Sequence, residues 1–313
     1  MGSAEGTGAL QDRVIIVTGG GRGVGREHAL LFAREGAKVV VNDLGGAQDG
    51  TGADLGPAAE VVAEIAAFGG QAVANGDSVS DWEGSQRMVN QAIETFGDLH
   101  AVVNNAGILR DRMLVNMTEA EFDAVVNVHQ KGTWLMMRHA GAYWREMVKA
   151  GKEVKGSIVN TSSTSGLHSN PGQVNYGGAK AAIATMSIIA ARELGRYGVR
   201  VNAIAPSART RMTLATPGLG ERIKEPEDGS FDVWDPANIS PLVAWLCTEE
   251  CEATAQVYWV GGSRIGRYQE WTQVDLAVND DAWTVANVAE AVGGWESGHV
   301  NTRGIRITGT EKI

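Results

Sequence analysis

The chain has 313 residues, a formal net charge of −10 and hydrophobic side chains at 43% of its positions. This composition is typical of a globular protein with a substantial core, and the negative charge argues against a nucleic-acid partner. No apolar stretch reaches the ~18 residues that a membrane span needs, so we expect no membrane partner. The N-terminus does not resemble a secretory signal, which predicts a cytoplasmic protein. Cys247 and Cys251 have no further ligand at metal spacing, so we expect no metal site.

Short β-branched runs alternate with helical patterns along most of the chain. Strands are expected near residues 14–17, 38–42, 72–75, 101–104, 157–160, 201–204 and 256–260. Helices are expected near residues 24–35, 57–68, 81–96, 119–150, 179–197 and 238–248. This alternation predicts an α/β fold with a single doubly wound parallel sheet of the Rossmann type and helices on both faces. Ligands of such sheets bind in a crevice at the carboxyl ends of the strands.

The alternation defines the expected domain boundaries. We expect one Rossmann-type domain over residues 11–265, preceded by a flexible N-terminus at residues 1–10. A C-terminal extension follows at residues 266–313, and we expect it to pack on the domain or on a partner subunit. It carries one helical pattern, which Asp280 or Asp281 is expected to cap.

The first predicted strand runs into a glycine-rich turn, Thr18-Gly19-Gly20-Gly21-Arg22-Gly23-Val24-Gly25. Its glycines allow the backbone to turn sharply and to approach a pyrophosphate, which would lie on the N-terminal amides of the next helix. Asp43 closes the second strand, where a carboxylate accepts hydrogen bonds from the adenosine ribose and repels a 2′-phosphate. The pattern therefore favours NAD over NADP as the cofactor. A flexible loop and an ordinary solvated aspartate are the alternatives.

Tyr176 and Lys180 lie four residues apart, and Ser163 lies thirteen residues before the tyrosine. Residues four apart share one face of a helix, so the ammonium of Lys180 is expected beside the phenol. A fixed cation there would lower the pKa of Tyr176 toward the working range and let it exchange a proton with an alcohol or a carbonyl oxygen. A Tyr-x3-Lys pair also occurs by chance on surface helices, so this hypothesis depends on the surrounding motifs.

In this order, the motifs resemble the classical short-chain dehydrogenase/reductase family over roughly residues 10–265. Asn104-Asn105-Ala106-Gly107 resembles the signature that follows the fourth strand of that family. The resemblance implies an oxidoreductase that uses NAD to interconvert a secondary alcohol and a ketone. It implies that Tyr176 is the general acid/base, that Lys180 lowers its pKa and holds the nicotinamide ribose, and that Ser163 stabilises charge on the substrate oxygen. The cofactor contacts that it implies are Gly19, Arg22, Gly23, Val24, Gly25, Asp43, Asp77 (near adenine), Asn104, Ala106, Gly107, Tyr176, Lys180 and Pro206.

The chain departs from the family pattern at three positions. The fourth catalytic residue is usually an asparagine, and His129 takes its place. Ser207 replaces a glycine, and Arg211 replaces a threonine. His129 is expected to be either a packed helix residue or the fourth catalytic group, because the family asparagine works largely through a backbone carbonyl that histidine retains. The departures resemble a subgroup, the dehydrogenase domains of peroxisomal multifunctional enzymes, which oxidise (3R)-3-hydroxyacyl-CoA.

The resemblance leads to one substrate hypothesis, conversion of 3-hydroxyacyl-CoA to 3-oxoacyl-CoA. Arg110, Arg112, Arg209 and Arg211 would then meet the CoA phosphates, or they would pair with nearby acids such as Asp111. Residues 209–234 fit the strand–helix alternation poorly and are expected to form a loop or lid.

Two other functions are compatible with the sequence. One is a hydroxysteroid or terpene-alcohol dehydrogenase, which the nine tryptophans would suit. The other is a non-catalytic protein that senses nicotinamide cofactors, although such proteins often lose the tyrosine. Family members commonly associate through the helices expected here at residues 119–150 and 179–197, which implies a homodimer or a homotetramer.

Overall fold

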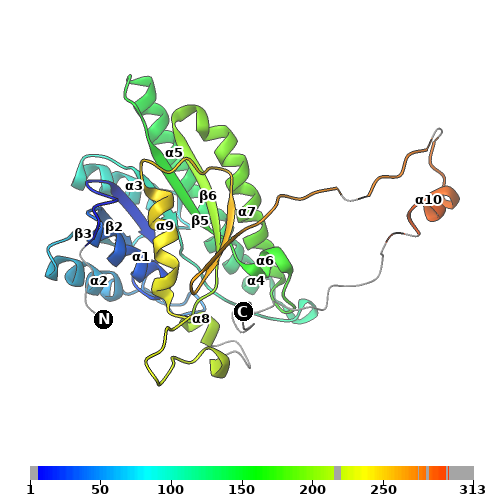
Figure 1. Cartoon of the computed structure of the whole chain (residues 1–313), viewed down its shortest axis with the longest axis horizontal. Coiled ribbons are helices and arrows are strands. Elements are labelled where there is room, and N and C mark those ends of the chain that lie inside the picture. Colours follow the sequence, from blue (N-terminus) through cyan, green and yellow to red (C-terminus); the bar gives the residue numbers. More distant parts are fainter. Residues whose placement is uncertain (1–5, 215–219, 274, 280–281, 294, 296–313) are drawn as a thin grey trace.

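The computed structural model describes residues 6–214, 220–273, 275–279, 282–293 and 295 (Figure 1). One sheet of eight strands in the order β3-β2-β1-β4-β5-β6-β7-β8 forms its centre. The strands are β1 (Val14–Thr18), β2 (Lys38–Asn42), β3 (Gln71–Asn75), β4 (Ala101–Asn104), β5 (Gly156–Thr161), β6 (Val199–Pro206), β7 (Val257–Gly261) and β8 (Arg264–Arg267). Every neighbouring pair is parallel except β7 and β8. The predicted doubly wound sheet is confirmed, with an antiparallel edge strand added.

Helices cover both faces of the sheet, and each face has its own hydrophobic core. Alternate residues of β1 separate the two cores: Ile15 and Val17 face one, and Val14 and Ile16 face the other. The first core lies under α1 (Gly23–Arg34), α2 (Gly56–Ala67) and α9 (Ser240–Cys247). The second lies under α3 (Trp82–Phe96), α5 (Gly132–Lys149) and α7 (Val174–Leu194). Burial on both faces explains why the central strands are continuously apolar in sequence.

The structure corrects several helix predictions. The helix expected over residues 119–150 is three segments: α4 (Glu119–Val126), a π-helical turn η2 (Asn127–Lys131) and α5. α7 begins at Val174, five residues before the predicted start, and the short helix α6 (Thr164–His168) was not predicted. α9 ends at Cys247, so Cys251 lies beyond the end of the helix. Both thiols are buried and free.

The segment predicted as a loop or lid contains two short helical turns. They are α8 (Arg211–Leu214) and η4 (Gly220–Ile223). The remaining short elements are η1 (Leu114–Asn116), η3 (Gly195–Tyr197) and η5 (Pro236–Ile239).

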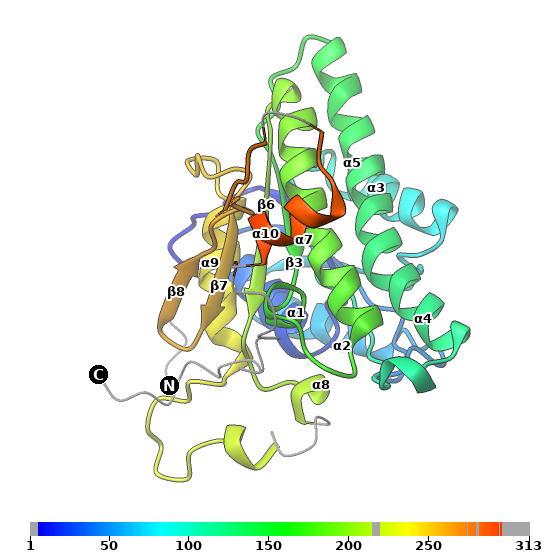
Figure 2. The same ribbon diagram turned by 90° about the vertical axis from the view of Figure 1, so that its right-hand side faces the viewer.

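The chain after β8 leaves the α/β body and carries α10 (Val285–Val292) away from it (Figures 1 and 2). The structure therefore does not pack α10 on its own domain, and packing on a partner subunit stays a prediction. Thr284 begins α10 with a capping box to Asn287. The predicted caps Asp280 and Asp281 lie outside the described residues. Within the described residues, no helix is long and apolar enough to cross a membrane.

Candidate active site

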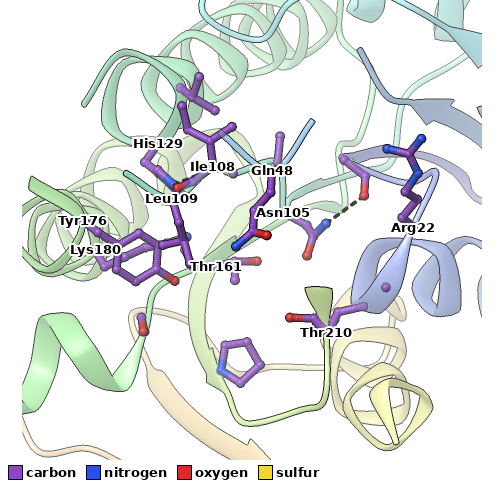
Figure 3. Close-up of a pocket in the computed structure, with 18 of the residues that line it drawn as sticks. Arg22, Gln48, Asn105, Ile108, Leu109, His129, Thr161, Tyr176, Lys180 and Thr210 are labelled. Atoms are coloured by element: carbon purple, nitrogen blue, oxygen red, sulfur yellow. Dashed lines mark hydrogen bonds between the residues drawn. The ribbon is translucent and has the colours of Figure 1, made fainter. Parts of the chain in front are cut away.

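A cavity of about 370 Å³ lies at the carboxyl ends of the central strands, where the fold predicts ligand binding (Figure 3). It contains most of the residues that the sequence predicted for the cofactor and the catalytic groups. Those lining it are Gly19, Arg22, Gly23, Val24, Asp43, Asp77, Ala106, Gly107, His129, Ser163, Tyr176, Lys180 and Pro206. Gly25 and Asn104 lie outside the lining.

The glycine turn has a shape that only glycines allow. Gly19 and Gly23 have φ of +63° and +53°, which other residues rarely adopt. A Cβ at Gly25 would lie 2.1 Å from the carbonyl oxygen of Gly19, so Gly25 permits close packing instead of lining the cavity. α1 begins at Gly23 without a side-chain cap and without an acid in its first turn. Its free amides suit a phosphate, so these residues fit a dinucleotide.

The carboxylate of Asp43 is held in place by backbone amides. Gly21 N–H donates to its Oδ2 at 2.9 Å and Gly45 N–H to its Oδ1 at 2.7 Å. The sequence neighbours of Asp43 include no arginine, but the glycine turn brings Arg22 into the same cavity, where its Nη1 donates to the carbonyl of Gly46 at 3.2 Å. Asp77 also lines the cavity and pairs with Arg87.

The signature after β4 contributes a residue that sequence reasoning missed. Asn104 is 4% exposed and donates from Nδ2 to Asn160 Oδ1 at 2.8 Å, so its side chain lies in the core. The next residue, Asn105, lines the cavity and donates to the carbonyls of Thr18 and Gly19 at 3.1 and 3.0 Å. Asn105 therefore joins the end of β4 to the glycine turn.

Tyr176 and Lys180 lie near the start of α7, and Ser163 lies opposite them as the N-cap of α6. Lys180 Nζ is 5.6 Å from the centroid of the Tyr176 ring and donates to the carbonyl of Thr161 at 2.5 Å. Ser163 Oγ accepts from the amide of Ser165 at 3.1 Å. The structure thus brings the three predicted catalytic side chains together at the lining of one cavity.

Burial changes the predicted electrostatics of this group. It raises the pKa of Tyr176, which the nearby charge of Asp111 also raises and a hydrogen bond with Ser163 lowers. Burial lowers the pKa of Lys180 to about 7. The net shift of the Tyr176 pKa is therefore upward, because the same apolar surroundings penalise both charged forms. That Lys180 in its charged form lowers the pKa of the phenol stays a prediction.

His129 lies in the π-helical turn η2 and is 1% exposed. Its Nε2 is 2.8 Å from the carbonyl oxygen of Ile108, and its ring meets the Tyr176 ring edge-on with centroids 5.1 Å apart. Burial lowers the pKa of His129 to about 3, so the ring is neutral at physiological pH. The Nδ1 atom is buried and has no hydrogen-bond partner in the described part of the chain. His129 is therefore a packed residue that also borders the cavity.

Only glycine fits at position 107, next to His129. A Cβ on Gly107 would lie 2.3 Å from Cε1 of the histidine. The last residue of the Asn-Asn-Ala-Gly signature thus makes the room that the imidazole occupies.

Further residues lining the cavity come from loops that sequence patterns do not place. They include Gln48, Leu109, Asn170, Gln173, Thr210, Thr213, Ile223 and Trp234. The predicted lid at residues 209–234 supplies the last four, and that segment was recognisable from its poor fit to the alternation. Gln48 lies in a glycine-rich segment that follows Asp43. This position after a predicted cofactor-binding residue was the only feature of the sequence that pointed to Gln48 as a cavity residue.

The arginines considered for CoA binding have partners within the chain. Arg110 Nε donates to the carbonyl of Asp49 at 2.8 Å, and Arg112 pairs with Glu121 at 2.9 Å. Arg209 pairs with Asp232. These contacts favour the alternative in which the arginines pair within the chain. Asp111, the acid named as their partner, instead accepts from Gln173 Nε2 at 2.8 Å. The side chain of Arg211 lies outside the described part of the structure.

Comparisons with known proteins agree with this site. Residues 13–217 match the short chain dehydrogenase family model. A putative short-chain type dehydrogenase/reductase of Mycobacterium tuberculosis is 47% identical over 82% of this chain and 85% of its own length. The hydroxyacyl-CoA dehydrogenase ChsB1 of the same organism is 43% identical over 82% of this chain and 79% of its own. A crystal structure of a short chain dehydrogenase from Mycobacterium avium is 49% identical, with a TM-score of 0.81, over 91% of this chain and 96% of that one.

The chain belongs to the short-chain dehydrogenase family, and it is an oxidoreductase acting on CH–OH groups of a small-molecule substrate. Enzymes of this family use NAD or NADP. Peroxisomal multifunctional enzyme type 2 of Mus musculus is 42% identical over 82% of this chain, and the chain spans 32% of its length. The prediction of a cytoplasmic location stays a prediction.

Proposed function

We propose that this enzyme uses NAD to interconvert the secondary alcohol of a 3-hydroxyacyl-CoA and the corresponding ketone. The observation that carries the proposal is the meeting of Ser163, Tyr176 and Lys180 in the cavity that also contains the glycine turn and Asp43. The carboxylate fixed at Asp43 supports NAD, because a 2′-phosphate would lie against it. The relative named as a hydroxyacyl-CoA dehydrogenase supports the substrate class.

The side chains divide the chemistry in the following way. NAD, when bound, would supply the hydride acceptor for the carbinol carbon. Tyr176 in its phenolate form would take the hydroxyl proton of the substrate on its oxygen. Ser163 hydrogen-bonds Tyr176 and would hold the substrate oxygen beside it. The reverse reaction returns the proton from Tyr176 to the ketone oxygen.

Lys180 assists Tyr176 only in its charged form. The buried ammonium stabilises a phenolate nearby, but a pKa of about 7 means that the amine is charged in only part of the population at neutral pH. Because Lys180 and Tyr176 lie close together, protonation of one changes the pKa of the other. The apparent pKa values in the pH dependence of the reaction are therefore those of the coupled pair.

His129 would support catalysis by holding Tyr176 in place. Its neutral ring packs against Tyr176 and restrains the phenol. Its Nδ1, which has no hydrogen-bond partner among the described residues, offers a hydrogen-bonding atom for a water molecule beside the cavity. The π-helical turn fits such a role, since such turns are frequent at functional sites.

The test is steady-state kinetics, following NADH absorbance with a 3-hydroxyacyl-CoA, the matching free 3-hydroxy acid and a hydroxysteroid. We expect the highest kcat/KM with the thioester, and equal turnover of thioester and free acid would refute the CoA assignment. Tyr176→Phe should abolish oxidation with all three compounds while leaving NADH binding nearly unchanged. Full activity in this variant would refute the role of the tyrosine.

We also propose a homo-oligomer that forms through α5 and α7. Both helices expose large apolar side chains, with Trp134 45% and Ile189 48% exposed. Light scattering after size-exclusion chromatography should give a dimer or a tetramer, and a smaller species for the double variant Trp134→Lys/Ile189→Lys.

A further inference from the structure

The connection between β2 and α2 forms a compact loop, residues 44–54, which we call the strap. Its two ends meet where the amide of Asp54 donates to the carbonyl of Leu44 at 2.8 Å. Two hydrogen bonds close its tip. The amide of Ala47 donates to the carbonyl of Thr51 at 2.7 Å, and the amide of Gly50 donates to the carbonyl of Ala47 at 3.0 Å. A loop with adjoining ends and internal hydrogen bonds has a defined shape and is often functional.

The strap lines the cavity and is hydrogen-bonded to residues on two sides of it. On the side of the glycine turn, Arg22 Nη1 donates to the carbonyl of Gly46 at 3.2 Å. On the opposite side, the amide of Leu109 donates to the carbonyl of Gln48 at 3.1 Å, and Arg110 Nε donates to that of Asp49 at 2.8 Å. The walls joined in this way are those between which a dinucleotide would lie.

Gln48 directs its side chain into this space. In Figure 3 its carboxamide reaches into the cavity between Asn105 on one side and Tyr176 on the other. The structure gives this half-buried carboxamide no hydrogen-bond partner among the described residues, although it can both donate and accept. Its backbone is fixed at Leu109, so the side chain is presented from a held position.

We propose that Gln48 contacts the bound nicotinamide dinucleotide and that the strap must detach from Leu109 and Arg110 before the dinucleotide exchanges. This inference rests on the proposed function, because it assumes that the cavity binds that cofactor. The attachments at Leu109 and Arg110 involve one backbone and one side-chain hydrogen bond, so they can break while the strap keeps its internal bonds.

The first experiment measures the rate of NADH release by stopped-flow fluorescence and its Kd by titration. Gln48→Ala removes the carboxamide, and Arg110→Met removes one attachment. Each should raise the release rate roughly two- to tenfold, the effect expected for one lost hydrogen bond. Arg145→Met is the matched control, because Arg145 pairs only with Glu146 at the exposed surface of α5 among the contacts described for it. Its release rate should equal that of the wild type.

The second experiment locks the strap with a reversible disulfide. A Cβ on Gly50 would lie 3.8 Å from Cβ of Ile108, which is close to the mean Cβ separation in disulfides. We expect oxidised Gly50→Cys/Ile108→Cys, closed before NADH is added, to bind it much more slowly than the same protein after reduction. Gly50 has φ +87°, so a side chain there is strained, and thermal unfolding of the double variant serves as the check that it folds.

NADH binding with release rates unchanged in Gln48→Ala and Arg110→Met would overturn the inference about the strap and leave the proposed function standing. Equal binding rates in the oxidised and reduced double variant would overturn it as well. A wild-type protein that does not bind NADH would overturn both proposals.

Discussion

Gly107→Ala tests whether the fit between Gly107 and His129 supports the catalytic tyrosine. The new methyl group would lie 2.3 Å from Cε1 of His129 and 3.1 Å from its Nδ1. Ordinary contact begins at 3.4 Å, so the ring or the backbone must move by about 1 Å. The ring cannot move freely, because its Nε2 lies 2.8 Å from the carbonyl of Ile108 and the ring meets that of Tyr176 edge-on.

The expected magnitudes follow from this displacement. Overpacking a buried site costs about 1–3 kcal/mol, which lowers the melting temperature of a domain of this size by about 2–12 °C. A shift of about 1 Å at the tyrosine would lower kcat by up to about 100-fold. The variant should therefore lose much more activity than its lower stability explains at assay temperature.

The assays are differential scanning calorimetry and NADH absorbance with the best alcohol substrate. Gly195→Ala is the matched control, because a Cβ there meets nothing within 4 Å, and we expect it to leave both readings unchanged. The double variant Gly107→Ala/His129→Asn removes the atom that clashes and should recover stability and part of the activity. Wild-type kcat and melting temperature in Gly107→Ala would refute the reasoning.

Three further predictions concern charged groups of the site. Lys180 has a pKa of about 7 in the folded protein against an ordinary 10.5, so the unfolded chain binds more protons between these pH values and stability rises with pH there. Lys180→Met should reduce that rise in the free energy of unfolding, measured by urea unfolding at about pH 7 and about pH 9.5. An equal rise in the variant and the wild type would contradict the shift. Asp43→Asn should raise kcat/KM with NADP relative to NAD by about tenfold or more, and an unchanged ratio would assign the discrimination to other groups. Arg209→Met removes the partner of Asp232 and a donor to the carbonyl of Ile223, so it should raise KM for the alcohol more than Kd for NADH, and the opposite order would show that this segment serves mainly the cofactor.

The strands were predictable because their environment is simple. A strand covered on both faces is apolar throughout, and β1, β2 and β4 have this pattern. β8 was missed because its four residues alternate between half-buried and exposed and include an arginine at each end. Edge strands carry little hydrophobic signal, so their presence depends on a neighbour that the local sequence does not reveal.

The break at His129 was not predictable from helical periodicity. Residues 119–150 have a continuous helical pattern, yet the chain forms a π-helical turn where His129 packs against Gly107, Ile108 and Tyr176. These contacts join three separate parts of the chain. The sequence motifs identified each participant, but only the tertiary structure shows that they meet.

The positions of Tyr176 and Lys180 were predictable from their spacing, whereas the sign of the pKa shift was not. Spacing on a helix determines proximity, but the pKa depends on how much water surrounds each group. Here desolvation is the largest cause of the shift at both groups, raising the pKa of Tyr176 and lowering that of Lys180. A phenolate at Tyr176 therefore needs Lys180 to be charged in the same buried place, so the two protonation states are coupled. Oxidation should consequently depend on pH through the pair, with a profile that Lys180→Arg, which keeps the charge, moves to higher pH at its alkaline limb. An unchanged alkaline limb in that variant would show that Lys180 does not control the proton on Tyr176.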